Sequence, residues 1–146
     1  PDGLFFITGG GDHIVRQWEL MSGELIQELK GHTDEIRTVA ISRDCKTLIS
    51  GSWDGNIKLW DTASGELLET LSDHQGRITS IAISPDNSTL LSGGTDSQLK
   101  LWNLDNYQLQ SSLESNSGSI FSVAFGSTER EFISSSEEQT IKFWQR

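Results

Sequence analysis

The chain has 146 residues, a formal net charge of −10 and one cysteine, Cys45. The acidic balance argues against a nucleic-acid partner, because binding a phosphate backbone depends on clustered Lys and Arg side chains. One cysteine excludes an intramolecular disulfide and a thiolate metal site, and it fits a reducing, cytoplasmic compartment. No apolar run approaches the roughly 18 residues that span a bilayer, so we expect no membrane partner.

A period of 42 residues organises the chain. A tryptophan recurs at this interval, and an acidic residue and a hydroxyl residue keep the same interval before it. The three series are Trp18, Trp60, Trp102 and Trp144; Asp12, Asp54, Asp96 and Glu138; and Thr8, Ser50, Ser92 and Ser134. Each unit alternates polar and apolar residues around a turn rich in Asp, Gly and Asn, as a β-hairpin does. A period of this length without a helical pattern indicates an array of small β-sheets.

The predicted strands follow this period through one domain, residues 1–146, divided into repeats 1–30, 31–72, 73–114 and 115–146. The expected strands are 4–9, 14–18 and 25–29; 36–42, 47–51, 57–60 and 67–71; 78–84, 89–93, 99–102 and 107–113; and 120–125, 132–135 and 141–144. The first repeat thus lacks a leading strand and the fourth lacks a last one. The leading strand at 36–42 is apolar enough to be buried on both faces.

The recurring motifs resemble those of the WD-repeat β-propeller family over the whole length of the chain. They include Gly31-His32, Trp60-Asp61, Ser84-Pro85-Asp86 and the Ile-Lys-Leu-Trp segment that ends at Trp60. In this family each repeat forms a four-stranded blade around a central channel. The resemblance implies an all-β fold, a propeller segment of four-stranded antiparallel blades with incomplete first and last blades.

The resemblance also implies a structural role for the recurring polar residues. In the second repeat, His32, Ser50, Asp54 and Trp60 would form a buried hydrogen-bonded tetrad that satisfies each polar group. The third repeat offers the same set as His74, Ser92, Asp96 and Trp102. In the fourth repeat Asn116 and Glu138 replace the His and the Asp. Because its tetrad is incomplete, we expect this blade to be the least stably held of the four.

Catalysis by these residues is not expected. Ser, His and Asp are the parts of a hydrolase triad, but here they recur in register with a tryptophan, and no Gly-x-Ser-x-Gly elbow is present. The three histidines, His13, His32 and His74, are far apart in the sequence, which argues against a metal site. No Gly-rich phosphate loop followed by a lysine occurs. We therefore expect no catalytic residue, cofactor or metal.

The expected binding surface is the face where the leading strands begin and the Asp-containing turns lie. Carried over from the family position by position, it comprises Glu35, Arg37, Trp53, Arg77, Thr79, Thr95, Ser119, Phe121 and Glu137. Trp53 is the preferred interface anchor, because tryptophan and arginine are enriched at interfaces. The alternative is a Trp53 side chain that lies flat across a neighbouring loop. Phe121 is a weaker candidate, since it can pack on the adjacent blade.

The sequence predicts a non-catalytic scaffold that binds a protein or peptide. The alternative is a regulatory or recruitment domain of a larger bacterial signalling enzyme, such as a kinase or ATPase. Because a propeller must close to protect its strand edges, we expect this chain to be the C-terminal part of a longer ring, completed by upstream chain. Self-association of two chains is the competing possibility, but their missing strands lie in different blades.

Overall fold

The computed structural model describes residues 3–115 and 118–146, and these form fourteen β-strands. The first seven are β1 (Phe5–Gly9), β2 (Ile14–Glu19), β3 (Leu25–Lys30), β4 (Ile36–Ile41), β5 (Thr47–Ser52), β6 (Ile57–Asp61) and β7 (Leu67–Leu71). The second seven are β8 (Ile78–Ile83), β9 (Thr89–Gly94), β10 (Gln98–Asn103), β11 (Leu109–Glu114), β12 (Ile120–Phe125), β13 (Glu131–Ser136) and β14 (Ile141–Gln145). Each strand predicted from the sequence is present, with small shifts at the ends.

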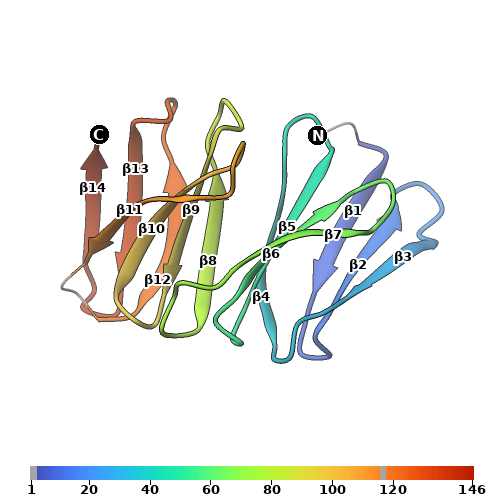
Figure 1. Ribbon diagram of the computed structural model, residues 1–146, viewed down its shortest axis with the longest axis horizontal. Helices are drawn as coiled ribbons and strands as arrows, with labels where there is room; N and C mark the ends of the chain where they lie inside the picture. The colour runs from blue at the N-terminus through green and yellow to red at the C-terminus, as the bar shows by residue number, and fades with distance from the viewer. Residues whose placement is uncertain (1–2, 116–117) are drawn as a thin grey trace.

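The strands form four antiparallel sheets in chain order: β1-β2-β3, β4-β5-β6-β7, β8-β9-β10-β11 and β12-β13-β14. Figure 1 shows the sheets stacked one after another, with the β4 sheet beside the β8 sheet at the middle of the molecule. The leading strands β4, β8 and β12 are neighbours, since β8 contacts both of the others. The expected all-β class, with two complete four-stranded sheets between two incomplete ones, is confirmed.

In each sheet one hairpin turns through a left-handed residue at the same position of the repeat: β1–β2, β5–β6, β9–β10 and β13–β14. These residues follow the acidic residue of each repeat: His13, Gly55, Ser97 and Gln139. Their φ angles lie between 60° and 83°. In the first three turns the aspartate side chain accepts a backbone N–H two residues on, as where Asp54 Oδ1 accepts that of Asn56 at 2.9 Å. The repeat therefore fixes a local geometry as well as a strand pattern.

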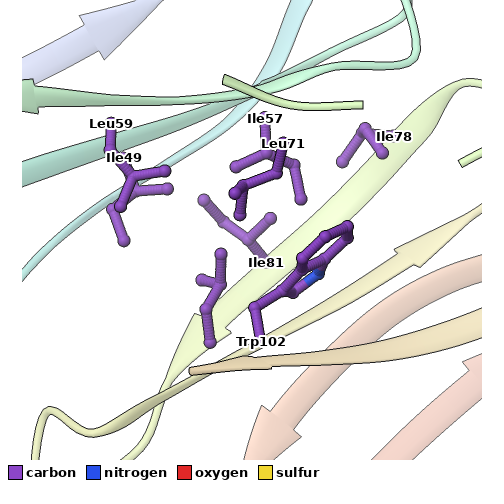
Figure 2. Packing of buried hydrophobic residues seen from close by; sticks show 8 residues of the cluster. Ile49, Ile57, Leu59, Leu71, Ile78, Ile81 and Trp102 are labelled. Carbon is purple, nitrogen blue, oxygen red and sulfur yellow. The ribbon is translucent and has the colours of Figure 1, made fainter. Parts of the chain in front are cut away.

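The hydrophobic core lies between the sheets. Figure 2 shows the central cluster, in which Ile49 and Ile57 of the second sheet pack toward Ile78, Ile81 and Trp102 of the third. Two similar clusters join the first sheet to the second and the third to the fourth. Fully burying one such aliphatic side chain contributes about 1.5–3 kcal/mol, so each interface between sheets holds its neighbours firmly.

A glycine in the second strand sets how closely two sheets approach. A Cβ on Gly51 would lie 2.6 Å from Ile78 Cγ2 of β8 and 2.8 Å from Thr38 Cγ2 of β4. Glycines one period earlier and one period later meet an isoleucine of the next sheet in the same way. The absence of a side chain at this position therefore allows the leading strand of each following sheet to pack against it.

The predicted strand at 107–113 is wrong at its start, because β11 begins at Leu109. Tyr107 has a φ of 61°, which is incompatible with an extended strand. Gly23 and Gly65 occupy the equivalent turn positions two periods and one period earlier, with φ of 70° and 73°. The tyrosine thus keeps a turn conformation that glycine adopts in the other repeats.

Burial of the leading strand on both faces is also wrong. In β4 only Ile36 is buried, and Arg37 is exposed. The strands buried along nearly their full length are β5 and β9. The cause is the position of the strand in its sheet, because β4 is an edge strand whereas β5 lies between β4 and β6. The side chains of β5 also pack against both neighbouring sheets.

Candidate functional site

A buried chain of hydrogen bonds joins the β5–β6 hairpin to the loop before β4. Trp60 Nε1 donates to Ser50 Oγ at 2.9 Å, and Ser50 Oγ lies 2.8 Å from His32 Nε2. His32 Nδ1 lies 2.8 Å from Asp54 Oδ2, which also accepts the backbone N–H of Thr33 at 3.0 Å. The structure thus brings together the four residues that the resemblance singles out in the second repeat.

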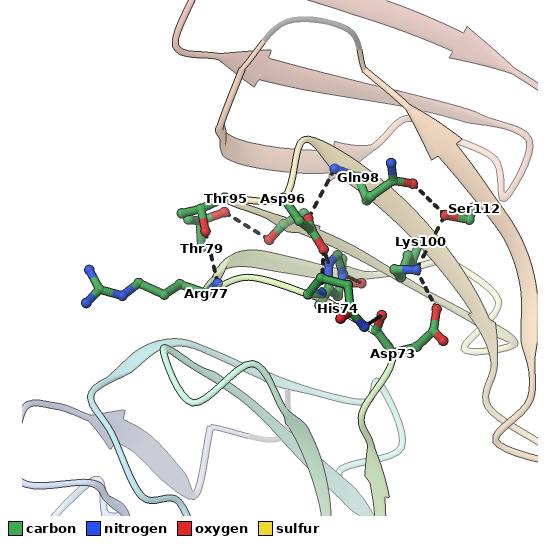
Figure 3. Close-up of polar contacts among 12 residues, drawn as sticks. Asp73, His74, Arg77, Thr79, Thr95, Asp96, Gln98, Lys100 and Ser112 are labelled. Carbon is green, nitrogen blue, oxygen red and sulfur yellow. Dashed lines mark hydrogen bonds and ion pairs between the residues drawn. The ribbon is translucent and has the colours of Figure 1, made fainter.

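The third repeat carries the same arrangement with the same distances. Trp102 Nε1 donates to Ser92 Oγ at 2.9 Å, and His74 lies 2.8 Å from both Ser92 Oγ and Asp96 Oδ2. Figure 3 shows Asp96 between His74 and Gln98, whose backbone N–H donates to the Asp96 carboxylate at 3.1 Å. Each set therefore links a tryptophan on the third strand to a loop that precedes the first.

The pKa shifts and hydrogen bonds of the second-repeat set indicate which of its groups carry protons. Burial lowers the pKa of His32 below the ordinary value of 6.5, against the opposing effect of the Asp54 carboxylate, so the imidazole is neutral at pH 7. Ser50 accepts from Trp60, so its hydroxyl donates to His32 Nε2 and leaves Nδ1–H to donate to Asp54. Burial alone would raise the pKa of Asp54, but the hydrogen bonds from Thr33 and His32 outweigh it and hold that pKa below 3.8.

The first and fourth repeats keep only part of the arrangement. Trp18 donates to Thr8 Oγ1 and Trp144 donates to Ser134 Oγ, both at 2.9 Å. Asp12 pairs instead with Arg16 at 2.5 Å on an exposed surface. Glu138 is exposed, and Asn116, which the sequence places at the histidine position, lies outside the described residues. The tryptophan contact is thus common to all four sheets, whereas the complete set occurs in the two central ones.

Each polar set fixes the loop before a sheet to the strands of that sheet, and its groups are not accessible to a substrate. Ser50 is fully buried and bonded to both Trp60 and His32, and the His32 side chain is only 1% exposed, so a substrate cannot reach either group. Within residues 3–115 and 118–146, no cluster of three or more His, Cys, Asp and Glu side chains could hold a metal ion. That part of the chain also contains no helix with the length and hydropathy of a membrane span.

On the predicted binding face, two arginines gather on one tryptophan. The guanidinium carbon of Arg77 lies 4.3 Å from the ring centroid of Trp53, and that of Arg37 lies 5.1 Å away. Trp53 is half-buried, whereas both arginines are exposed. We call these three residues the arginine–tryptophan cluster. Both separations lie within the range of cation–π attraction.

The other predicted face residues form contacts that fix its backbone. Arg77 and Thr95 are joined by backbone and side-chain hydrogen bonds, and Thr79 Oγ1 donates to the carbonyl of Gly93 at 2.9 Å. Glu137 N donates to the carbonyl of Ser119 at 2.9 Å, as Trp53 N does to that of Glu35. Phe121 is 59% exposed, so it does not pack against the adjacent blade in this structure.

Sequence reasoning placed Arg37, Trp53 and Arg77 on one face but missed that the two arginines share one indole. Arg37 and Arg77 do not occupy equivalent positions in their repeats, so the period gives no signal for their meeting. It also missed the ion pair between the buried Lys100 and Asp73, which Figure 3 shows beside His74. A lysine precedes Leu101 and Trp102 as it does in the second repeat, and this recurrence was the available signal.

The stacked antiparallel sheets, two of them carrying a Trp–Ser–His–Asp set of hydrogen bonds, define a repeat protein built from β-propeller blades. The sequence matches the family described as WD domain, G-beta repeat, over residues 23–61, 65–103 and 107–145. These three matches cover well over half of the chain, and the chain belongs to the WD40 repeat family.

Several curated proteins are similar to a part of the chain. Cilia- and flagella-associated protein 52 of Sus scrofa is 38% identical over 50 residues, which are 34% of this chain and 8% of that protein. The human protein of the same name is 35% identical over 49 residues, with 34% and 8% covered. An uncharacterized WD repeat-containing protein of Schizosaccharomyces pombe is 32% identical over 50 residues, with 34% and 12% covered. The matched segment therefore spans about a tenth of the length of these relatives.

Proposed function

We propose that the chain is a non-catalytic scaffold that binds a protein or peptide partner on the face defined above. The observation that carries the proposal is the exposure of large side chains there. Phe121 stands 59% exposed on β12, and the arginine–tryptophan cluster lies across the beginnings of β4 and β8. Aromatic and arginine side chains are the usual anchors of protein interfaces. Because β4, β8 and β12 are neighbours, these anchors form one row.

The rest of the structure supports a display role. The leading strands are held by closely packed cores and by the two complete polar sets, so the face is pre-organised before a partner arrives. WD40 repeat domains are typically non-catalytic scaffolds, and the buried serines and histidines fit that description. No contact among the described residues favours the alternative of a regulatory or recruitment domain in a bacterial kinase or ATPase.

The test is selection from a displayed library of random peptides against the whole chain. We expect enriched peptides that protect backbone amides at the beginnings of β4, β8 and β12 from hydrogen exchange. Phe121→Ser should weaken their binding at least about tenfold. Phe143→Ser is the matched control, because Phe143 is 86% exposed but lies on β14, away from this face. Peptides that depend on Phe143 and not on Phe121 would contradict the proposal, as would a library that yields no binders.

We further propose that the outer faces of the first and last sheets pack against additional blades. Ile133, Ile141 and Phe143 are 37%, 68% and 86% exposed, whereas the residues one period earlier, among them Leu99 and Leu101, are buried between sheets. Upstream chain supplies these blades more readily than a second copy does, because the incomplete sheets lack strands on opposite edges. Sedimentation separates the two sources, since a monodisperse dimer would favour the second copy.

The cellular setting belongs to the same proposal. The chain has a single cysteine, Cys45, which is half-buried in the turn between β4 and β5. A fold that depends on packed β-sheets and not on disulfides suits a reducing, cytoplasmic compartment. Fractionation of cells that express the tagged protein checks this, and recovery from the secreted fraction would contradict it.

A further inference from the structure

The arginine–tryptophan cluster is held in place from three separate segments. Arg37 is the second residue of β4, where the pairing with β5 shifts register between Ile36 and Thr38. Trp53 begins the β5–β6 turn, and its backbone N–H is fixed by Glu35. The backbone of Arg77 is bonded on both sides to Thr95, before β8 begins. In Figure 3 the Arg77 side chain extends away from the hydrogen-bonded group around His74. The guanidinium groups are thus positioned by the fold of two neighbouring sheets.

The positive charge of the cluster is not neutralised by the rest of the described chain. Among residues 3–115 and 118–146, neither Arg37 nor Arg77 takes part in an ion pair, although the chain carries 21 acidic residues. Asp54 and Glu35, which lie in the segments that carry the cluster, form no ion pair with either arginine. The Asp54 carboxylate binds His32 and backbone amides, and the Glu35 side chain extends toward Gly11 of the first sheet.

The two guanidinium groups concentrate positive charge near one indole, and the cation–π attraction of each to the ring favours this position. Each guanidinium keeps a planar fork of N–H donors that matches the two oxygens of a carboxylate. An anion bound at the cluster would accept from these donors and offset the positive charge. The free cluster is therefore arranged for an anionic ligand.

A hollow next to the cluster offers space for such a ligand. It has a volume of about 300 Å³ and is open to solvent. It is lined on one side by Trp53, Asp54 and Gly55 of the β5–β6 turn, and on the other by His74, Gln75, Gly76 and Arg77 of the loop before β8. The Asp54 carboxylate in this lining is already bonded to His32 and to the backbone N–H of Thr33. The two segments approach closely at Gly55, where an added Cβ would lie 3.3 Å from the Gly76 carbonyl oxygen. The size and openness of the hollow suit one side chain of an extended peptide better than a buried small molecule.

We propose that the arginine–tryptophan cluster binds the carboxylate side chains of an acidic peptide segment, with Arg37 and Arg77 as the ligand-contacting donors. The inference rests on the proposed function and specifies the chemistry of the partner. The net charge of −10 opposes a polyanionic nucleic acid, whose binding needs many clustered cations and not two. The same net charge also opposes an acidic peptide, but a short segment presents few charges and needs only the two local arginines.

The test is a titration of the full chain with two short peptides that differ only in a central run of Glu or of Gln, followed through the indole N–H resonances. We expect the Glu peptide to shift the Trp53 resonance and to bind at least about tenfold more tightly than the Gln peptide. Arg37→Gln and Arg77→Gln should each weaken the Glu peptide about tenfold, and added salt should weaken it further. Arg37→Lys should give an intermediate loss, because it keeps the charge and loses the fork.

The matched control is Arg43→Gln, which removes an exposed arginine between β4 and β5 at the opposite end of the sheet and should leave the affinity within about twofold. Equal binding of both peptides, or no effect of the two cluster variants, overturns the inference. If neutral peptides from the library still bind this face, the scaffold role stands and only the carboxylate assignment falls. Preference for a phosphoserine peptide or for single-stranded DNA over the Glu peptide also overturns it.

Discussion

Replacing Asp54 by alanine tests the polar set most sharply. The Asp54 side chain is 5% exposed and accepts hydrogen bonds from His32 at 2.8 Å, Thr33 at 3.0 Å and Asn56 at 2.9 Å. Thr33 is exposed, so water can replace its lost partner at small cost. The His32 ring is 1% exposed, so its Nδ1–H would stay buried without an acceptor, which costs about 1–3 kcal/mol. Adding a modest loss at the Asn56 turn, we expect Asp54→Ala to lower the free energy of unfolding by about 2–4 kcal/mol.

Urea denaturation followed by tryptophan fluorescence measures this loss. Asp96→Ala should cost a similar amount, because the third repeat has the same contacts. Glu138→Ala is the matched control and should cost less than about 0.5 kcal/mol, since Glu138 is exposed. Equal losses in all three variants, or no loss in any, would refute the reasoning, because burial of the imidazole would then have no bearing on stability.

Packing and protonation give two further predictions. Gly51→Ala should destabilise the fold by about 1–3 kcal/mol, because its methyl group would collide with Ile78 and Thr38; an unchanged unfolding midpoint would show that the sheets can move apart freely. Stability should also fall as the pH drops below about 6.5, because His32 binds a proton in the unfolded chain more readily than in the folded one, where its pKa is lowered. It should fall further below 3.8, because Asp54 is then protonated in the unfolded chain before it is protonated in the folded one. Unfolding measured across this range should show a shallower slope near pH 6 for His32→Gln, and an identical slope would contradict the assignment.

The strands could be predicted because the repeat supplies the same information four times. The alternation around Trp60 recurs at each tryptophan, so a weak local signal becomes strong by repetition. The start of β11 could not be predicted, because Tyr107 stands where glycine marks the turn in two other repeats, and residue type alone does not reveal its left-handed backbone. The exposure of Arg37 depends on the position of β4 at the edge of its sheet. The composition of the strand does not reveal that position.

The candidate site was predictable only in part. The residues of each polar set keep fixed intervals, so family resemblance groups His32 with Asp54 from the amino-acid sequence alone. The meeting of Arg37 with Arg77 depends on how two sheets pack, and the residues are not equivalent in the repeat. Interactions between neighbouring sheets therefore need the three-dimensional arrangement of the blades, whereas those within one repeat do not.

The most direct test of a binding face is Trp53→Ala, measured for both stability and affinity. Trp53 is half-buried and contacts two exposed arginines, so its loss should lower the free energy of unfolding by about 1–2 kcal/mol. The same variant should weaken peptides selected on the whole chain by at least about tenfold. A loss of roughly 3–5 kcal/mol, as for a core aromatic, together with unchanged peptide affinity, would show that Trp53 serves the fold and would contradict the proposed face.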